Sequence, residues 1–348
     1  MTQTAAIPMR FVGPINITSE YINDCVRVPL ATYETPLWPS VSRGAKISRA
    51  VTGGINVDII NDVMTRSIVL EAPTAKEAHQ FIRTINAQFS ILQDIVTTTS
   101  RFAMLSNIHS DIVGNLIYLR FSLETGDASG HNMVTKAAEA LCHWILKTHP
   151  DLRYISLSAN YCTDKKVSAV NGILGRGKHV VADIIIPRED CLRILRTTPE
   201  AIVELNLKKN LIGSTLAGSL RSANAHFANM LLAIYLATGQ DAANIVEGSQ
   251  GIVHTQVKQN DLYFSVSLPN VIVGTVGNGK TLPFVIDNLR ALGCDKNTSG
   301  NSAKRLACIV GATVLCGELS LLAALTHPDE LMRSHQLMER KKTNEETC

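Results

Sequence analysis

Hydrophobic and polar positions follow their most regular pattern in residues 66–158. The run 66–71 (RSIVLE) is rich in β-branched residues and stops before Pro73, which predicts a short strand. Apolar residues at helical spacing then predict an amphipathic helix that begins at Thr74 and ends near Gln88. The apolar face of this helix consists of Ala75, Ala78, Phe81, Ile82 and Ile85.

The second half of this region repeats the alternation of strand and helix. Two β-rich runs, 100–112 and 115–124, flank Val113-Gly114 and predict a hairpin. A helical pattern covers 129–148, and a strand-like run, 153–158, follows it. The predicted order β-α-β-β-α-β is the ferredoxin-like arrangement, which says little about function by itself.

The flanking segments show a different pattern. Residues 1–65 are mixed and contain five prolines. Helical patterns after residue 158 cover 188–197, 200–211, 223–238, 282–292 and 303–325. The last of these is rich in Ala, Leu, Cys and Val, so we expect a buried helix. The predicted fold class is therefore α+β. It has a mainly helical large domain (1–65 and 157–336), an inserted ferredoxin-like small domain (66–156) and a flexible tail (337–348).

The composition is typical of a soluble globular protein. The 348 residues are 45% hydrophobic, enough for about two domains with cores of their own. The formal charge is +3 with no basic stripe, so no nucleic-acid partner is expected. The apolar runs are shorter than the ~18 residues of a membrane helix, and residues 1–10 lack a secretion signal. Eight cysteines without a CxxC pattern predict buried thiols and a cytoplasmic location.

One glycine-rich segment matches a nucleotide-binding pattern letter by letter. Residues 274–281 (GTVGNGKT) fit the triphosphate-binding loop, in which backbone N–H groups and a lysine hold the phosphates. Only 68 residues follow Lys280, which is too few for the parallel sheet that such a loop requires. A glycine turn between a strand and a helix is the simpler interpretation, and the triphosphate hydrolase is kept as a distant alternative.

Four other clusters each allow a structural and a functional interpretation. Lys165 and Lys166 are either solvated charges or stabilisers of a developing oxyanion. The segment 125–133 either contains a helix cap or offers its glycine-rich backbone to a cofactor phosphate. Residues 224–229, with Asp241 further along, either bond across a buried interface or belong to a site. His335 lies in a charged tail, where a lone histidine is normally inert.

In their order along the chain, these segments resemble the 3-hydroxy-3-methylglutaryl-CoA reductases, and more closely the eukaryotic and archaeal class than the bacterial class. The most specific matches are NYCTDKK (160–166), NAHFAN (224–229) and GQDAA (239–243). The resemblance extends from about residue 7 to residue 336. It also includes IPMRFVGPINI (7–17), ATYETPLWPSVSRG (31–44), DVMTR (62–66), GDASGHNM (126–133), GRGK (175–178), KKNLIGSTLAGS (208–219), DLYFSVSLPNVIVGTVG (261–277), CGELSLLAAL (316–325) and RSH (333–335).

The resemblance implies an enzyme that reduces hydroxymethylglutaryl-CoA to mevalonate and free CoA, with NADPH and without a metal. Lys165 would stabilise the oxygen that gains charge, and Glu34 would act as a general acid. Asp241 would hold Lys165 and Glu34 in one network, and His335 would protonate the departing thiolate.

The resemblance also implies binding residues and a quaternary state. The substrate residues would be Arg66, Ser158, Asn160, Lys166, Lys209 and Asn229; the CoA residues Ser40 and Arg43; the cofactor residues Asp127, Asn132, Gly274 and Gly277. Three of the substrate residues are cations that suit the free carboxylate of the substrate. Family members are dimers with shared active sites, so we expect a homodimer or a higher homo-oligomer.

The chain departs from the family pattern in three places. The family's cofactor motif is DAMGMNM, and Ser129 and His131 replace two of its methionines, so NADH is not excluded as the cofactor. The family's glycine loop is GTVGGGT, in which Asn278 and Lys280 are substitutions. The family's amino-terminal helical segment and its ENVIG dimer motif do not occur in this sequence. This motivates the alternative of an impaired or non-catalytic remnant that binds CoA thioesters.

Overall fold

The computed structural model describes residues 5–295 and 300–339. Helices and strands are mixed, as the predicted α+β class requires, and one long strand, β3 (Ile55–Glu71), belongs to two sheets. Up to Val63 it pairs with β7, and from Met64 it pairs with β5. The domain boundary expected between residues 65 and 66 therefore falls inside a continuous strand, close to the point where its partners change.

The smaller sheet has the predicted ferredoxin-like order. Its strands β4 (Met104–Val113), β5 (Leu116–Glu124), β3 and β6 (Arg153–Ser156) lie in that order, and all neighbours are antiparallel. Helices α2 (Ala75–Ala87) and α4 (His131–Thr148) confirm the helical patterns, and Thr74 caps α2 by accepting from the Glu77 N–H at 3.3 Å. Helix α3 (Phe89–Thr99) was not predicted. Its apolar side helps to close the core of this unit.

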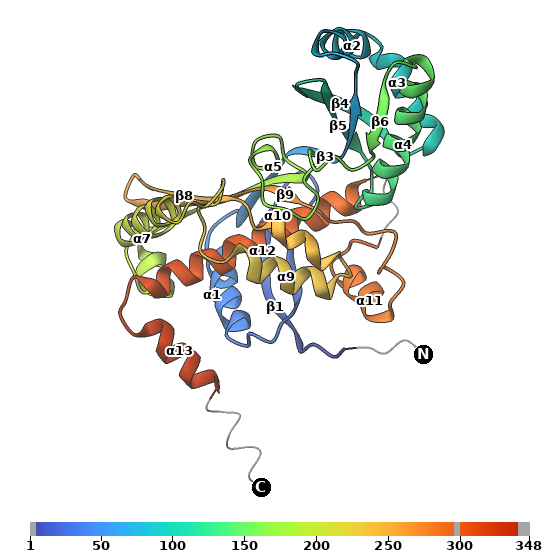
Figure 1. Cartoon of the computed structure of the whole chain (residues 1–348). Coiled ribbons are helices and arrows are strands. Elements are labelled where there is room, and N and C mark those ends of the chain that lie inside the picture. The colour runs from blue at the N-terminus through green and yellow to red at the C-terminus, as the bar shows by residue number, and fades with distance from the viewer. Residues whose placement is uncertain (1–4, 296–299, 340–348) are drawn as a thin grey trace.

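The larger part is built on a sheet that the sequence patterns did not predict. Its strands lie in the order β2 (Asn23–Ala31), β1 (Met9–Thr18), β3, β7 (Gly177–Ile186), β9 (Asp261–Val271) and β8 (Ile252–Lys258). Several of these strands are buried over consecutive residues, so they lack the alternation that reveals a half-exposed strand. Helices α1 (Leu37–Ala50), α9 (Phe227–Ala237) and α12 (Asn301–Leu325) pack with the sheet in one core (Figure 1).

The remaining helices are short and connect these elements. They are α5 (Ala169–Leu174), α6 (Arg188–Asp190), η1 (Cys191–Leu195), α7 (Pro199–Leu205), η2 (Asn206–Gly213), α8 (Ser214–Leu216), η3 (Ala242–Asn244), α10 (Ile245–Gly248), α11 (Pro283–Ala291) and α13 (Glu330–Glu339). Residues 337–339 of the expected tail continue α13, and residues 340–348 lie outside the described part of the chain.

Helix α12 is the buried helix that its composition predicts. It is long and apolar enough to cross a membrane, but 94% of its most apolar stretch is buried inside the protein. Its contact with α1 is so close that a Cβ on Gly44 would lie 2.2 Å from the carbonyl oxygen of Cys316. Only glycine fits at that position, and α12 is therefore the core helix of the larger part.

Candidate active site

The loop that carries Lys165 has an unusual backbone. Asn160, Thr163 and Lys165 all have left-handed conformations, with φ of 57°, 44° and 56°. A non-glycine residue in this region costs about 1–3 kcal/mol and persists only where surrounding contacts hold it. Here the Lys165 N–H donates to Glu247 Oε1 at 3.1 Å, and the Cys162 N–H donates to the Ser67 hydroxyl at 3.0 Å.

Lys165 forms an ion pair with Asp241. Its Nζ lies 2.7 Å from Asp241 Oδ2, at the turn that follows α9. The hydrogen bond to Asp241 raises the pKa of Lys165 above its ordinary value, so the lysine remains cationic. Burial raises the pKa of Asp241 and is the largest single effect on it, but the hydrogen bonds from Lys165 and the Ala243 N–H and the charge of Lys165 together hold the pKa below its ordinary value. The structure thus brings two predicted catalytic residues together as a charged pair.

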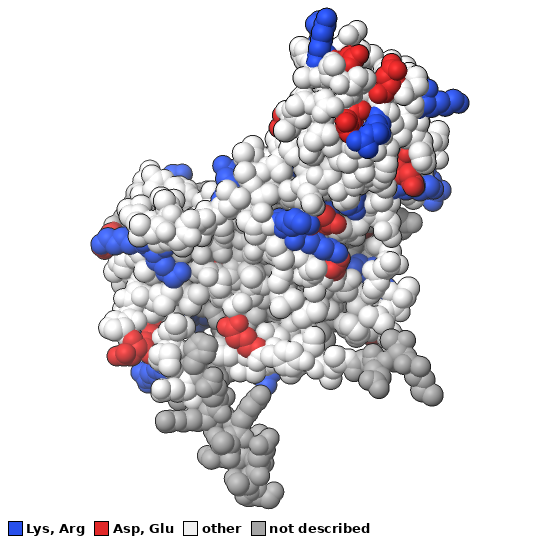
Figure 2. Space-filling model, viewed as in Figure 1, with Lys and Arg blue, Asp and Glu red and all other residues white. Residues whose placement is uncertain are grey.

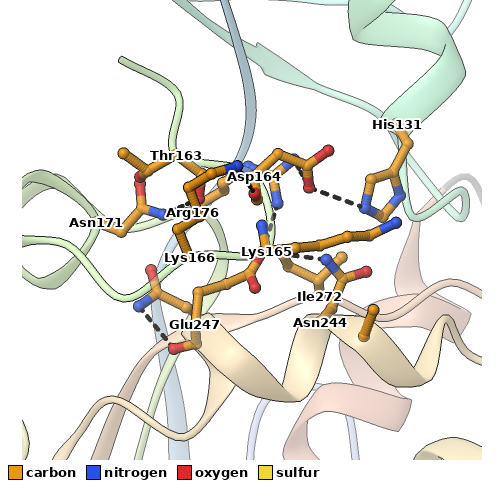
Figure 3. Close-up of polar contacts among 12 residues, drawn as sticks. His131, Thr163, Asp164, Lys165, Lys166, Asn171, Arg176, Asn244, Glu247 and Ile272 are labelled. Atoms are coloured by element: carbon orange, nitrogen blue, oxygen red, sulfur yellow. Dashed lines mark hydrogen bonds and ion pairs between the residues drawn. The ribbon is translucent and has the colours of Figure 1, made fainter. Parts of the chain in front are cut away.

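A buried arginine supports this loop and lies between Asp164 and Glu247 (Figure 3). The Arg176 side chain is fully buried, with its Nη1 2.7 Å from Glu247 Oε1 and its Nη2 2.9 Å from Asp164 Oδ1. Burial raises the pKa of Glu247, which is also fully buried. Arg176 therefore connects Asp164, the residue before Lys165, with Glu247, which accepts from the Lys165 N–H. The sequence placed Arg176 only within a matching stretch, because no local pattern marks a buried ion pair.

The predicted substrate residues separate into two groups. Arg66 lies beside the loop, with Nη1 3.3 Å from the Ser158 hydroxyl and 3.8 Å from Asp164 Oδ2. Lys166 is exposed and donates to the Asp164 carbonyl at 3.2 Å, and Asn160 is exposed in the same loop. Lys209 lies on η2 and contacts Asn210 instead. Lys209 thus lies on a different element from Arg66 and Lys166.

Asn229 lies instead with predicted catalytic and CoA residues around a cavity of about 410 Å³, which we call the Glu34 pocket. It contains the predicted residues Glu34, Ser40, Arg43 and Asn229, and Asn229 Nδ2 donates to Glu34 Oε2 at 2.8 Å. Arg43 donates to the Ser320 hydroxyl at 3.0 Å and pairs with Glu330 at 3.1 Å, which joins α1 to α12 and to the start of α13. The full lining is Glu34, Pro36, Leu37, Pro39, Ser40, Arg43, His226, Asn229, Ser320, Leu321, Ala324 and Leu331.

Two further residues of this pocket region were not predicted as site residues. His226 lies in the pocket wall beside Asn229. Glu318, fully buried on α12, accepts from the Ala225 N–H at 2.8 Å and from the His226 N–H at 2.6 Å. Burial raises the pKa of Glu318. The motif 224–229 was recognised in the sequence, but the carboxylate that orients it comes from a segment far along the chain.

The Lys165–Asp241 pair and the Glu34 pocket lie at opposite ends of α9. Asn229, which binds Glu34, is in the first turn of this helix, and Asp241 follows its carboxyl end. Eleven helical residues span roughly 16 Å at about 1.5 Å per residue. The predicted network of Glu34, Asp241 and Lys165 therefore does not form within one chain.

Two glycine-rich segments meet beside Lys165 and contain the predicted cofactor residues. A Cβ on Gly274 would lie 2.3 Å from the Ser129 backbone nitrogen, so the segments touch through their main chains. Gly277 is left-handed and faces open space where a Cβ would be, and the same holds for Gly126. Asn132 is exposed in the first turn of α4. Open backbone at the amino end of an 18-residue helix fits a phosphate-bearing dinucleotide.

The Asp127 side chain has a structural contact here. Its carboxylate accepts from the Gly300 N–H at 2.9 Å and from the Ala303 N–H at 2.8 Å, at the start of α12. Its carbonyl accepts from the Thr275 N–H at 2.8 Å. Asp127 thus joins both glycine-rich segments to the core helix α12, whereas α4, the helix that a cap in segment 125–133 would serve, begins after Gly130 without a side-chain cap.

Lys280 does not adopt the role of a phosphate-binding lysine. Its ammonium donates to the carbonyl of Gly239, two residues before Asp241, and burial lowers its pKa to about 8. The contact holds segment 274–281 against the end of α9. The triphosphate interpretation of this segment is not supported.

The last predicted catalytic residue is only partly described. His335 lies in α13, but its side chain is outside the part of the chain that the structure describes. Leu331, one turn earlier on this helix, lines the Glu34 pocket. Among the described residues, no group of three or more His, Cys, Asp or Glu side chains is arranged to hold a metal ion.

Comparison with known proteins gives concordant results. The family model of hydroxymethylglutaryl-coenzyme A reductase matches residues 1–340. The 3-hydroxy-3-methylglutaryl-coenzyme A reductase of Aeropyrum pernix is 44% identical over 337 residues, which cover 96% of this chain and 79% of that protein. That of Pyrococcus abyssi is 44% identical over 344 residues, which cover 98% and 84%. A class II reductase from Streptococcus pneumoniae, solved bound to NADPH in open conformations, has the same fold, with a TM-score of 0.73 at 21% identity over 94% of this chain and 86% of that one.

Proposed function

The chain belongs to the hydroxymethylglutaryl-coenzyme A reductase family, and we propose that it reduces (S)-3-hydroxy-3-methylglutaryl-CoA to mevalonate and free CoA with NADPH. The observation that carries the proposal is the Lys165–Asp241 pair, held in a strained loop beside the open glycine-rich backbone. This arrangement presents a permanent cation where a carbonyl oxygen would gain charge.

Lys165 is the electrophilic residue of the proposed site. When bound, NADPH would supply the hydrides, and two equivalents are needed because conversion of the thioester to the alcohol of mevalonate is a four-electron reduction. The Lys165 ammonium stabilises the oxygen that becomes negative, a contribution of about 3–4 kcal/mol for one well-placed donor. Asp241 keeps Lys165 charged and fixes its direction.

The Glu34 pocket supplies the other half of the reaction. Glu34 donates a proton as general acid, and Ser40 and Arg43 lie in the pocket wall that we assign to CoA. His335, on the helix that starts at this pocket, protonates the departing thiolate. Arg66, Ser158, Asn160, Lys166, Lys209 and Asn229 bind the hydroxymethylglutaryl group. Asp127, Asn132, Gly274 and Gly277 form the cofactor segment.

The complete site requires two copies of the chain. Glu34 and Lys165 lie at opposite ends of α9, too far apart to act on one carbonyl within one chain. Exposed apolar side chains on η2 and α8 support an interface between copies: Leu207, Leu211, Ile212 and Leu216. Charged residues of both signs are mixed on the face in Figure 2, and much of that face is uncharged. A cytoplasmic homodimer with shared active sites accounts for these features.

The test is the loss of NADPH absorbance that depends on hydroxymethylglutaryl-CoA. The wild type is expected to show it, and Lys165→Ala is expected to be about 10²–10³-fold slower, because one oxyanion donor is removed. Lys147→Ala, an exposed lysine on α4, is the matched control and keeps the wild-type rate. Folded wild-type protein that binds the thioester without turnover would contradict the proposal and favour the non-catalytic remnant.

A further inference from the structure

We propose that Ser129, His131 and Asp164 form a polar link between the cofactor segment and the loop that carries Lys165, which makes His131 a positioning residue for the reduction. This inference rests on the proposed function. Ser129 and His131 are the residues that replace methionines in the motif that the sequence resembles. The two substitutions contact each other, with Ser129 Oγ 3.4 Å from His131 Nδ1.

The His131 ring faces Asp164. Its Nε2 lies 3.9 Å from Asp164 Oδ1, and Figure 3 shows the ring directed at this carboxylate. Both atoms are buried, and neither has a hydrogen-bond partner among the described residues. Asp164 Oδ1 is otherwise approached by the Arg176 guanidinium at 2.9 Å. His131 Nε2 and Asp164 Oδ1 are thus a buried donor and a buried acceptor that face each other at 3.9 Å, and a small rotation of the ring would join them in a hydrogen bond beside the contact from Arg176.

The charges around His131 determine which ring nitrogen carries the proton. Burial and then Arg176 lower the pKa of His131 to about 4; Lys165 acts in the same direction, and Asp164 and Asp241 oppose it. The ring is therefore neutral at physiological pH and has one N–H. Because the Asp164 carboxylate only accepts, the proton belongs on Nε2, and Nδ1 accepts from the Ser129 hydroxyl. Two methionines at these positions could make neither bond.

The link ends next to the catalytic lysine. His131 is the first residue of α4 and follows the glycine-rich segment directly, whereas Asp164 precedes Lys165 and pairs with the buried Arg176. A shift of the cofactor segment is thereby passed through His131 to the loop. His131 does not need to touch a reacting atom; it fixes the direction of Lys165 when the cofactor segment is occupied.

The kinetic test uses His131→Met and His131→Gln. The Met variant removes the donor and is expected to lower kcat about tenfold, with KM for hydroxymethylglutaryl-CoA within twofold of wild type. The Gln amide keeps a donor near the position of Nε2 and is expected to restore kcat to within about threefold. His143→Met, an exposed histidine on the same helix, is the control for the chemical change. A Met variant with wild-type kcat, or a Gln variant as slow as Met, would overturn the inference.

A second readout does not depend on turnover. Imidazole ¹⁵N chemical shifts in histidine-labelled protein, with the His131 signal assigned by its loss in His131→Met, are expected to show a neutral ring protonated on Nε2 at neutral pH. Ser129→Ala is expected to shift the Nδ1 signal. A ring protonated on Nδ1, or one charged at neutral pH, would reject the link. Absence of wild-type turnover would instead reject the proposed function, so the two failures are distinguishable.

Discussion

At the scale of single residues, the loop that carries Lys165 is supported by the side chain of Arg176, which no motif assigns to catalysis. Arg176 and Glu247 are both fully buried and hydrogen-bonded to each other. A buried ion pair adds little net stability, but removal of one partner leaves an uncompensated charge in a low-dielectric interior. Arg176 is therefore a support of the loop, and its loss affects stability and geometry together.

We predict that Arg176→Met lowers the free energy of unfolding by about 3–5 kcal/mol, because Glu247 is left buried without its cation. Catalytic turnover is expected to fall as well, since the left-handed loop loses its anchor. Urea denaturation and kcat measure the two effects.

The companion variant Arg176→Met/Glu247→Gln removes the uncompensated charge and is expected to regain part of the stability without regaining turnover. Arg153→Met, which breaks an exposed pair with Glu71, is the control and should change stability by no more than about 1 kcal/mol. An Arg176→Met protein as stable as wild type would contradict this explanation.

At the scale of elements, the core helix α12 and the cofactor segment depend on one carboxylate. Asp127 caps α12 from the turn before α4, so the buried helix and the glycine-rich backbone hold each other in place. A carboxylate that caps a helix from another element accepts from N–H groups that have no partner inside the helix. Its negative charge is also stabilised by the partial positive charge at the amino end of the helix.

We predict that Asp127→Ala costs about 1 kcal/mol of stability, the usual effect of losing an amino-terminal cap, and that Asp127→Asn costs less. Thermal or urea unfolding measures the loss, and KM for NADPH is expected to rise only modestly. Asp151→Ala, at an exposed position after α4, serves as the control. Unchanged stability with a large rise in KM for NADPH would show instead that the carboxylate binds the cofactor directly.

At the scale of the whole molecule, one chain contains two incomplete halves of a site. Lys165 and Asp241 lie at the carboxyl end of α9, and Glu34 and Asn229 lie at its amino end. A twofold dimer brings the same surface of each copy together, so it can place both halves face to face twice.

We predict that Glu34→Ala and Lys165→Ala, each nearly inactive alone, recover activity when their subunits are mixed and exchanged. About half of the dimers are then mixed, and one of the two sites in each is intact, so about a quarter of wild-type activity returns. NADPH oxidation after exchange measures the recovery. If both residues acted within one chain, mixing would restore nothing.

Local patterns determined a large part of this protein. The period of apolar residues identified the small unit and its hairpin, and composition identified α12 as a buried helix, because both depend on which face of one element is apolar. The order of motifs identified the family, since residue types along the chain are sufficient for that comparison.

Only the tertiary structure determined how distant residues meet. The sheet of β1, β2, β7, β8 and β9 escaped prediction: β2 and β9 are buried over consecutive residues and lack a period of two, whereas β7 and β8 do alternate and were missed. The burial of Arg176, the cap by Asp127 and the contact of His131 with Asp164 each join different segments. The separation of Glu34 from Lys165 follows from the length of α9 between them. Such contacts depend on packing in three dimensions, which no local pattern encodes.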